Sequence, residues 1–541
     1  MTHARKTAAA AALAGVVALT VGALVGPAPG ASAASLPDAP RIDWSSCGDG
    51  FQCADVPVPL DYDRPTDGTI TVALLRLPAA DPAKRKGSLF VDPGGPGGSG
   101  VAVIRSEGEA YPQEVRDAYD LVGFDPRGVG GSTPLRCFDS EADALAAQHQ
   151  QKFPVTAADV VEWQRVDRVF ADACAAHGGP IIDHMSTANV ARDLDLLRRA
   201  VGDARLNYLG YSYGTYIGMT YANMFPTTVG AFVIDGVLDP VEWSTGNGAT
   251  SRTQPFTMRI GSAKGSEDTL DQFLTLCDQV GDRCALSGNA RARYEALLER
   301  AKAHPIPYPG FPEFLLTYPA IIGATLSGLY TPRWAGTAEL LAQLEAQPQA
   351  TAAAAAASSV GAPVGARAAA GLSPGFGDYP PFEAYAAVPC SETDNPTSFS
   401  AWPRAADKEA HRYPHFGALW TWDSTICSIW PARDADRYTG PWRATTSNPV
   451  LIVGNYYDAS TPYEGALAAS RLLKNARLLS YAGWGHSAYR KAGNACVDEA
   501  VTRYLLDNTL PARGTVCQPA GTPFDAPANP SLQLPPEPPA F

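Results

Sequence analysis

Residues 210–214 read Gly-Tyr-Ser-Tyr-Gly, and a short apolar run of strand type, residues 206–209, precedes them. Residues 215–225 are mostly apolar and of helix length, and a proline ends them. The pattern predicts a strand that turns sharply into a helix, with Ser212 at the turn. The two glycines leave room for the strained backbone that such a turn requires. The turn lifts the Ser212 hydroxyl clear of the sheet, where it is accessible as a nucleophile.

Two later loops supply the partners that a serine nucleophile needs. The strand-type run at residues 449–454 leads into Asp458, and the run at residues 476–481 leads into His486. Catalytic groups gather at the carboxyl ends of parallel strands, and the order serine, acid, histidine is that of the α/β-hydrolase fold. We therefore predict this α/β fold, with His486 as the base for Ser212 and Asp458 as the acid that orients the imidazole.

The acid has a rival in Asp235, which also follows an apolar strand, at residues 231–234. We favour Asp458 because its strand directly precedes the histidine strand, as the fold requires. Among the eight histidines of the chain, His486 has the clearest strand-then-loop setting.

A glycine-dense loop follows another apolar strand, and residues 92–100 read Asp-Pro-Gly-Gly-Pro-Gly-Gly-Ser-Gly. Backbone N–H groups in such a loop approach a substrate oxygen, so we predict that the N–H groups of Gly95 and Tyr213 form an oxyanion hole. A flexible turn or a phosphate loop is the alternative, but no lysine follows, as a phosphate loop requires. The loop also fits the dinucleotide pattern Gly-x-Gly-x-x-Gly, a weak match where glycine is so frequent.

Two charged residues, Asp125 and Arg127, follow the strand at residues 119–124. We interpret them as an ion pair or a hydrogen-bonded pair that shapes the loop, and not as catalytic groups.

Four motifs occur in order along the chain: residues 93–100 of the glycine-dense loop, Gly-Phe-Asp-Pro-Arg-Gly at 123–128, Tyr-Leu-Gly-Tyr-Ser-Tyr-Gly-Thr at 208–215 and Asp-Ala-Ser-Thr-Pro at 458–462. Together they resemble the secreted tripeptidyl aminopeptidases of actinobacteria, in the prolyl-aminopeptidase-like branch of the α/β-hydrolases. The likeness runs from about Ile42 to Cys517. It implies a serine exopeptidase that releases short peptides, typically tripeptides, from free N-termini. Ser212, Asp458 and His486 fall on that family's triad motifs.

The strand signal fades between residues 241 and 389, where several segments predict helices. We interpret this region as a mainly helical cap inserted into the hydrolase core. Its alanine-rich part, residues 350–370, contains glycine and proline, so we expect a mobile loop from residue 358 onward. The predicted divisions are a signal peptide (1–33), the first part of the core (34–240), the cap (241–389), the second part of the core (390–519) and an exposed proline-rich tail (520–541).

A cap over the nucleophile would leave room for only a few residues beyond the scissile bond, as exopeptidase action requires. The α-ammonium of the substrate then needs an anionic partner. Our candidate is Glu392, two residues after Cys390, where an acidic residue also occurs in the resembling family. Asp394 is the second candidate, and a solvated loop carboxylate is the alternative for both.

The composition is globular, with 45% apolar and 18% charged residues in a chain of 541. The net charge of −13 argues against nucleic acid or an anionic membrane surface as a partner. We expect peptide substrates with free N-termini.

The N-terminus predicts export. Arg5 and Lys6 precede an apolar run at residues 7–26, and Ala31-Ser32-Ala33 offers a small-residue cleavage site. This is the pattern of a secretory signal peptide, whose removal leaves a secreted protein without stable membrane association. An uncleaved anchor is the alternative, because the run is nearly long enough to span a bilayer.

Ten cysteines, an even number, suit an oxidising compartment and predict disulfides. Spacing favours pairing between neighbours along the chain but leaves the connectivity open: Cys47–Cys53, Cys137–Cys174, Cys277–Cys284, Cys390–Cys427 and Cys496–Cys517. The chain contains no Cys-x-x-Cys, and Pro414 interrupts the His411 and His415 pair, so we predict no metal site. We expect no cofactor.

Three classes of function remain. The first is the serine aminopeptidase, and the second is a carboxylic-ester hydrolase, an esterase or lipase, that uses the same triad. A non-catalytic binding module is the third, which the complete triad disfavours. The first two classes differ in whether the substrate must carry a free α-amine.

Overall fold

The computed structural model describes residues 37–348 and 382–525, which belong to one compact unit. The predicted signal peptide, the alanine-rich segment and most of the predicted tail lie outside the described residues.

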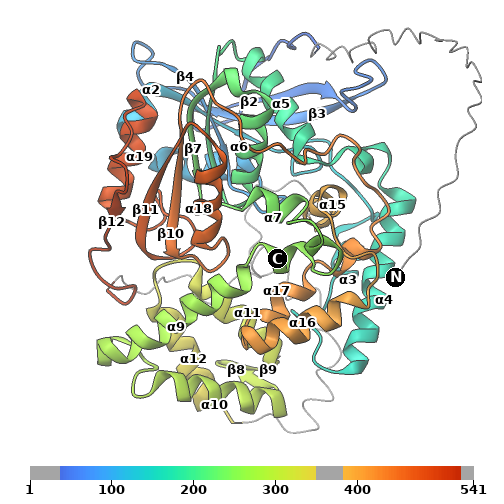
Figure 1. Cartoon of the computed structure of the whole chain (residues 1–541), viewed down its shortest axis with the longest axis vertical. Helices are drawn as coiled ribbons and strands as arrows, with labels where there is room; N and C mark the ends of the chain where they lie inside the picture. The colour runs from blue at the N-terminus through green and yellow to red at the C-terminus, as the bar shows by residue number, and fades with distance from the viewer. Residues whose placement is uncertain (1–36, 349–381, 526–541) are drawn as a thin grey trace, which may run out of the picture. The chain divides into compact units, whose positions relative to one another are not determined.

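A ten-stranded sheet forms the centre of the fold (Figure 1). Its strands lie in the order β1-β2-β3-β5-β4-β6-β7-β10-β11-β12. Neighbours are parallel from β5 to β12, whereas the pairs β1–β2, β2–β3 and β3–β5 are antiparallel. The strands are β1 (Ser45–Ser46), β2 (Gln52–Pro59), β3 (Thr69–Leu77), β4 (Gly87–Asp92), β5 (Tyr119–Phe124), β6 (Leu206–Tyr211), β7 (Val229–Asp235), β10 (Val450–Tyr457), β11 (Ala476–Trp484) and β12 (Val516–Cys517).

Helices cover both faces of this sheet (Figure 1). Every residue of β4, β5 and β7 is buried, which explains why these strands are continuous apolar runs in the sequence. Successive side chains alternate between two hydrophobic clusters; Phe90 belongs to one, and Leu89 and Val91 to the other. The first cluster contains residues of α5 (Thr187–Ala200), α6 (Tyr213–Met224) and α18 (Tyr463–Leu472), and the second contains residues of α1 (Gly100–Glu107), α2 (Gln113–Ala118) and α19 (Ala495–Asp507).

Between β7 and β10 the chain forms a mainly helical cap with a hydrophobic cluster of its own, which includes Leu270, Leu297, Leu326, Trp402 and Trp420. In Figure 1 most of these helices lie below the sheet, in the lower half of the view. Its elements are α7 (Pro240–Ser244), α8 (Phe256–Arg259), α9 (Ser262–Val280), α10 (Ala290–Ala303), β8 (Ile306–Tyr308), β9 (Phe311–Leu316), α11 (Tyr318–Leu329), α12 (Ala335–Ala346), α15 (Phe382–Glu392), α16 (Ala401–Arg412) and α17 (Gly417–Trp422).

The cap continues beyond the boundary predicted after residue 389. That boundary falls inside α15, and α16 and α17 contribute side chains to the same cluster as α9 and α10. The chain returns to the sheet only at β10. The sequence pattern did not predict this extension of the cap, because Trp402 and Trp420 contact the other cap residues only in the folded protein.

The predicted exposed tail also differs from the structure at its start. Phe524 is 5% exposed, and its ring packs against Phe273 and Trp334 of the cap. The backbone N–H of Trp334 donates to the carbonyl oxygen of Pro523 at 3.0 Å. Pro523 and Phe524, at the start of the predicted tail, therefore pack against the cap.

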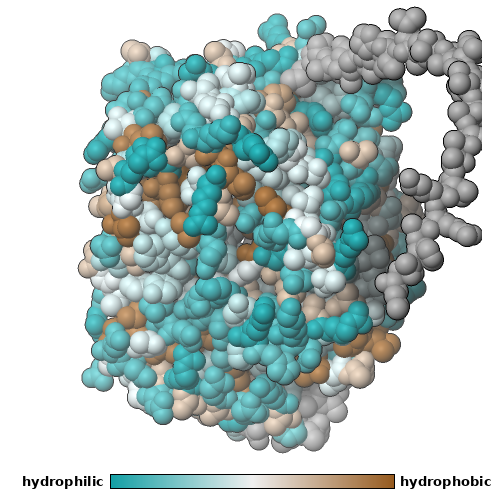
Figure 2. Space-filling view, viewed as in Figure 1, coloured by the Kyte–Doolittle hydropathy of each residue, from teal (hydrophilic) through white to brown (hydrophobic). Residues whose placement is uncertain are grey.

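Two further helices, α3 (Glu141–Ala146) and α4 (Ala157–His177), connect β5 with α5. Thr156 and Asp159 form a capping box that satisfies backbone groups at the start of α4. No helix in the described ranges combines the length and apolar character needed to cross a bilayer. The face seen in Figure 2 is mostly hydrophilic, with apolar side chains in small, separate groups.

Each cysteine pairs with its neighbour along the chain, as the spacing favoured. The bridges are Cys47–Cys53, Cys137–Cys174, Cys277–Cys284, Cys390–Cys427 and Cys496–Cys517, and none of the ten cysteines, all of which lie in the described ranges, is free. The pair Cys390–Cys427 ties α15 to the segment that follows α17.

We expect a non-reducing peptide map of the secreted protein to contain these five bridges and no free thiol. The reason is that the fold brings the two cysteines of each pair together and leaves none of the ten free. Alkylation before and after reduction, followed by mass spectrometry, measures it. Several alkylated cysteines before reduction would contradict both the pairing and export to an oxidising compartment.

Candidate active site

Ser212 sits at the turn between β6 and α6, in the backbone conformation of a nucleophile elbow. Its φ of 54° and ψ of −126° lie in a strained region for a residue with a side chain. A Cβ added to Gly210 would lie 2.5 Å from the carbonyl oxygen of Gly214, so the turn closes only around glycine. The sequence motif is thus explained by the close approach of the two arms of the turn.

His486 and Asp458, from the loops after β11 and β10, are hydrogen bonded. The Nδ1 atom of His486 lies 2.9 Å from Oδ1 and 3.1 Å from Oδ2 of Asp458. Parallel pairing of β10 with β11 brings the two loops together at the same edge of the sheet. This leaves Nε2 as the ring nitrogen available to act as a base.

Asp458 is buried, yet the protein stabilises its charge. Its Oδ1 accepts the N–H groups of Ser460 and Thr461 at 2.9 and 2.8 Å, and its Oδ2 accepts the N–H of Ser487 at 3.2 Å. Burial alone would raise the pKa of Asp458, but His486 and these donors hold it below its usual range. An ionised carboxylate at this position stabilises the imidazolium that forms when His486 takes a proton.

Ser212 and His486 pack on the same short segment at the end of β7. The backbone N–H of Ser212 donates to the carbonyl oxygen of Asp235 at 3.1 Å. A Cβ added to the next residue, Gly236, would lie 3.4 Å from Cε1 of His486. The fold thus gathers the elbow, the histidine loop and the acid loop around one point.

The rival acid, Asp235, has a different role. Its carboxylate accepts the backbone N–H groups of Ala488 at 3.0 Å and Tyr489 at 2.7 Å, which follow His486 in the chain. Burial raises the pKa of Asp235 to about 7. Asp235 therefore supports the loop that carries the histidine, while Asp458 contacts the imidazole itself.

The glycine-dense loop lies directly against the elbow. A Cβ added to Gly94 would lie 2.8 Å from both the Cβ of Ser212 and the backbone nitrogen of Tyr213. Tyr213 is the first residue of α6, so its N–H has no partner within the helix. Gly95 follows with a φ of 108°, a conformation that favours glycine. The predicted oxyanion donors thus belong to two segments that touch beside Ser212.

Asp125 and Arg127 do not form the pair that we predicted. Asp125 accepts the hydroxyl of Ser99 at 2.6 Å and the backbone N–H of Val101, and so braces the end of the glycine-dense loop. Arg127, fully buried, binds both carboxylate oxygens of Asp193 at 2.7 and 2.8 Å. Both residues are structural, but each has a different partner. Asp193, the partner of Arg127, lies on α5 and is distant in the sequence, so the local pattern did not reveal it.

Asp92, at the end of β4, lies beneath both segments of the predicted oxyanion hole. Its Oδ1 accepts the N–H of Gly94 at 2.8 Å, and a Cβ added to Gly214 would lie 2.7 Å from the same oxygen. The side chain is 1% exposed, and Oδ2 has no hydrogen-bond partner among the described residues. Burial raises the pKa of Asp92 to about 8, so the protonated, neutral form predominates at pH 7.

We expect hydrolysis of p-nitrophenyl acetate, which has no titrating amine, to slow as the pH rises through about 8. Ionisation of Asp92 would place a negative charge beside the donors that stabilise the oxyanion. Asp92→Asn stays neutral at every pH, so its kcat/KM should lack this alkaline decline. Rates measured on either side of that pH test it. The same decline in the variant would assign the titration to another group.

The two acids predicted to bind the substrate amine are both engaged within the protein. The Glu392 carboxylate is buried and accepts hydrogen bonds from the N–H and hydroxyl of Thr187, at 2.8 and 2.9 Å, and from the indole of Trp243 at 2.8 Å. Burial raises the pKa of Glu392 to about 7. Asp394 forms ion pairs with Arg433 and Arg437.

Sequence reasoning missed two residues beside the predicted triad. The hydroxyl of Thr461 donates to Oδ2 of Asp458 at 3.0 Å and lies 3.2 Å from Nδ1 of His486. The backbone carbonyl oxygen of Tyr330, from the cap, accepts the backbone N–H of His486 at 2.7 Å. The Tyr330 ring packs edge-on against the imidazole, with centroids 5.1 Å apart. The spacing Asp-x-x-Thr was a usable signal for Thr461. Nothing local marks Tyr330, because it reaches the site only through folding.

One cluster of three acids in the described ranges has oxygens close enough for a cation: Asp61, Asp63 and Asp436. Arg64 lies 2.9 Å from Asp61, and Arg192 lies 3.6 Å from Asp436. Arginines therefore already balance this cluster, and we assign no metal to it.

Comparisons with known proteins agree with this geometry. Residues 89–264 match the family model described as alpha/beta hydrolase fold, and residues 413–517 match the one described as TAP-like protein. The chain is 31% identical to a tripeptidyl aminopeptidase of Streptomyces coelicolor, over 89% of this chain and 87% of that protein. This chain belongs to the tripeptidyl aminopeptidase family. Its membership confirms the predicted α/β-hydrolase fold and makes it a serine hydrolase.

Two further proteins, both from Mycobacterium tuberculosis, are similar to this chain. Serine protease Hip1 of Mycobacterium tuberculosis is 29% identical over 88% of this chain and 91% of that protein. Carboxylesterase B of the same organism is 32% identical over 89% of this chain and 91% of that protein. The names of these relatives include both a peptidase and an esterase.

Proposed function

We propose that the protein is a secreted serine exopeptidase that releases short peptides, typically tripeptides, from free N-termini. The observation that carries the proposal is the Asp458–His486 pair, placed beside the Ser212 elbow in a chain of the tripeptidyl aminopeptidase family. Peptide substrates follow from the peptidases among its relatives.

In the proposed reaction, Nε2 of His486 takes the proton of the Ser212 hydroxyl as Oγ attacks the scissile carbonyl carbon. The N–H groups of Gly95 and Tyr213 bind the oxygen that becomes negative. His486 then gives its proton to the leaving amine, which departs as the shortened peptide. Water, activated by the same histidine, attacks the acyl-enzyme and releases the short N-terminal product.

Secretion is supported by two observations. All ten cysteines are in disulfides, which persist in oxidising compartments. The N-terminal segment has the charged, apolar and small-residue parts of a cleaved signal peptide. Edman or mass-spectrometric analysis of the secreted protein should therefore find an N-terminus close to residue 34.

We expect acetylation of the substrate N-terminus to lower kcat/KM by roughly 30-fold or more, since an ammonium–carboxylate pair in a closed cleft contributes about 2–5 kcal/mol. One unblocked peptide and its N-acetyl twin, compared by mass spectrometry of their products, measure the effect and the product length together. If the wild type cleaves both peptides equally, an esterase or an endopeptidase becomes the better assignment.

The alternative, a carboxylic-ester hydrolase, is favoured by one observation, the similarity to carboxylesterase B. An esterase would use the same triad but would need no acidic group for an amine. Turnover of simple acyl esters that greatly exceeds turnover of every unblocked peptide would favour it.

A further inference from the structure

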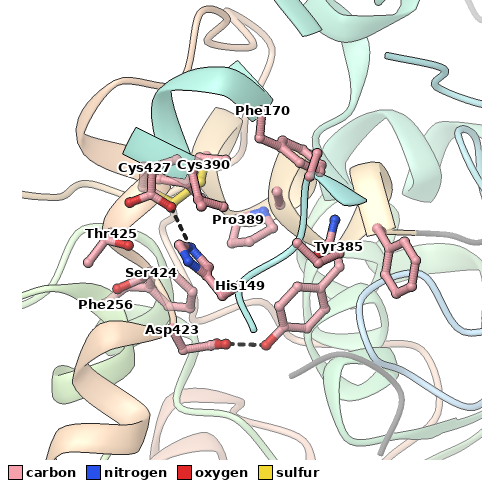
Figure 3. A pocket seen from close by; sticks show the side chains of 17 residues that line it. His149, Phe170, Phe256, Tyr385, Pro389, Cys390, Asp423, Ser424, Thr425 and Cys427 are labelled. Atoms are coloured by element: carbon pink, nitrogen blue, oxygen red, sulfur yellow. Dashed lines mark hydrogen bonds and ion pairs between the residues drawn. A yellow bond between two sulfur atoms is a disulfide. The ribbon is translucent and has the colours of Figure 1, made fainter. Parts of the chain in front are cut away.

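A cavity of about 100 Å³ lies between the cap and α4 (Figure 3). Its wall is formed by Phe256 of α8, by one side of α15, by residues 147–149 and by residues 423–427 after α17. The Cys390–Cys427 disulfide forms part of the wall and joins two of these segments. The cavity is therefore enclosed by disulfide-linked elements of the cap on one side and by α4 and residues 147–149 on the other.

Asp423 presents a carboxylate to this cavity. It is partly exposed, and it accepts a hydrogen bond from the hydroxyl of Tyr385 at 2.7 Å, as Figure 3 shows. Burial raises the pKa of Asp423 to about 6, while the charges of Lys152 and His149 act to lower it. At pH 7 the ionised form of Asp423 therefore predominates. An α-ammonium group, with a pKa of about 8, is still largely protonated at that pH.

The other acid in the wall, Asp167, is engaged through one carboxylate oxygen, while its Oδ2 has no hydrogen-bond partner among the described residues. Its Oδ1 lies 2.9 Å from Nε2 of His149, and the His149 ring stacks on Trp163 with centroids 3.6 Å apart. Asp167 itself is almost fully buried. Glu392, by contrast with Asp423, is buried and holds three internal hydrogen bonds.

Two sets of contacts link the cavity to the catalytic residues. In the first set, the Tyr330 ring packs against His486. Burial raises the pKa of the Tyr330 phenol, and the charges of Asp458 and Asp423 act in the same direction. In the second set, aromatic rings in contact link the elbow at Ser212 to the wall of the cavity.

In that second set, Tyr213 lies 5.5 Å from Trp243, and Trp243 lies 4.9 Å from Phe256, centroid to centroid. These three rings are buried, so the wall of the cavity packs through them on the elbow that carries Ser212. Three residues of extended peptide span about 10 Å. An amine-binding group for a tripeptide product would lie at about that distance from Ser212.

We propose that Asp423, held by Tyr385, binds the α-ammonium of the substrate, and that the cavity receives the N-terminal residue. This inference rests on the proposed aminopeptidase function and assigns its amine-binding subsite. Because the amine is held at Asp423 and the scissile bond at Ser212, the distance between these two residues would set the length of the acyl product.

The test measures kcat/KM for one tripeptide p-nitroanilide and its N-acetyl twin, with active sites counted by fluorophosphonate labelling. Asp423→Asn should lower kcat/KM for the free amine by roughly 30-fold or more and affect the acetylated substrate little, so the preference for free amines collapses. Asp423→Glu, which keeps the charge, should retain most of the preference. Asp167→Asn, a neutralised acid in the same wall, should keep it fully.

A wild-type preference that survives in Asp423→Asn would overturn the proposal, and its loss in Glu392→Gln alone would move the amine site to Glu392. If the wild type shows no preference, the aminopeptidase function itself fails, which is a separate result. Should Asp423→Asn not fold, Tyr385→Phe provides the same comparison. It removes the hydrogen bond that orients the carboxylate, so it should reduce the preference several-fold, and an unchanged preference would again refute the assignment.

Discussion

Ser212→Ala is expected to lower kcat for peptide release by roughly 10⁴-fold or more while folding and secretion stay intact. The hydroxyl is the group that forms the acyl-enzyme, and no other side chain at the elbow offers a nucleophile in the strained position of Ser212. Alanine removes only this oxygen, so the turn around Gly210 and Gly214 keeps its packing.

Steady-state kinetics on an unblocked tripeptide p-nitroanilide measure the loss, and a serine-directed fluorophosphonate should label the wild type at Ser212. Ser106→Ala is the matched control, because Ser106 is exposed on α1 and its hydroxyl bonds only to the backbone of its own helix. It should keep wild-type turnover and labelling. Labelling at another serine, or near-normal turnover in Ser212→Ala, would end the assignment.

Asp458→Asn is expected to lower kcat by roughly 10⁴-fold, because an amide at this position favours the wrong imidazole tautomer and cannot stabilise the imidazolium. The matched variant is Asp235→Asn. Asp235 bonds to the backbone after His486 and not to the ring, so its kcat should change far less. Circular dichroism and fluorophosphonate labelling separate loss of folding from loss of catalysis. A larger kcat loss in Asp235→Asn would show that the acid has been misplaced.

The base completes this comparison. His486→Ala should cost about as much as Ser212→Ala, and the double variant should lose little more, because the two residues act as one unit. Losses that multiply in the double variant would mean that His486 acts independently of Ser212.

Much of the fold could be predicted because it depends on local pattern. Buried strands such as β4 and β7 are continuous apolar runs, and the small residues at the elbow are required by the close approach of its two arms. The cap boundary could not be predicted in this way. Helices α16 and α17 belong to the cap only because Trp402 and Trp420 join its cluster, which is a long-range property.

By itself, the sequence determined the α/β-hydrolase fold and the order of Ser212, Asp458 and His486 along it, since both depend on local patterns and on the order of strands. The spacing favoured pairing of neighbouring cysteines, and the structure decided it. Only the tertiary structure decided which acid touches His486, that Arg127 binds Asp193, and that Asp423, not predicted from the sequence, lines a cavity. Hydrogen bonds and desolvation act between side chains that are neighbours in space. Their partners come from segments far apart in the chain, so no local pattern encodes them.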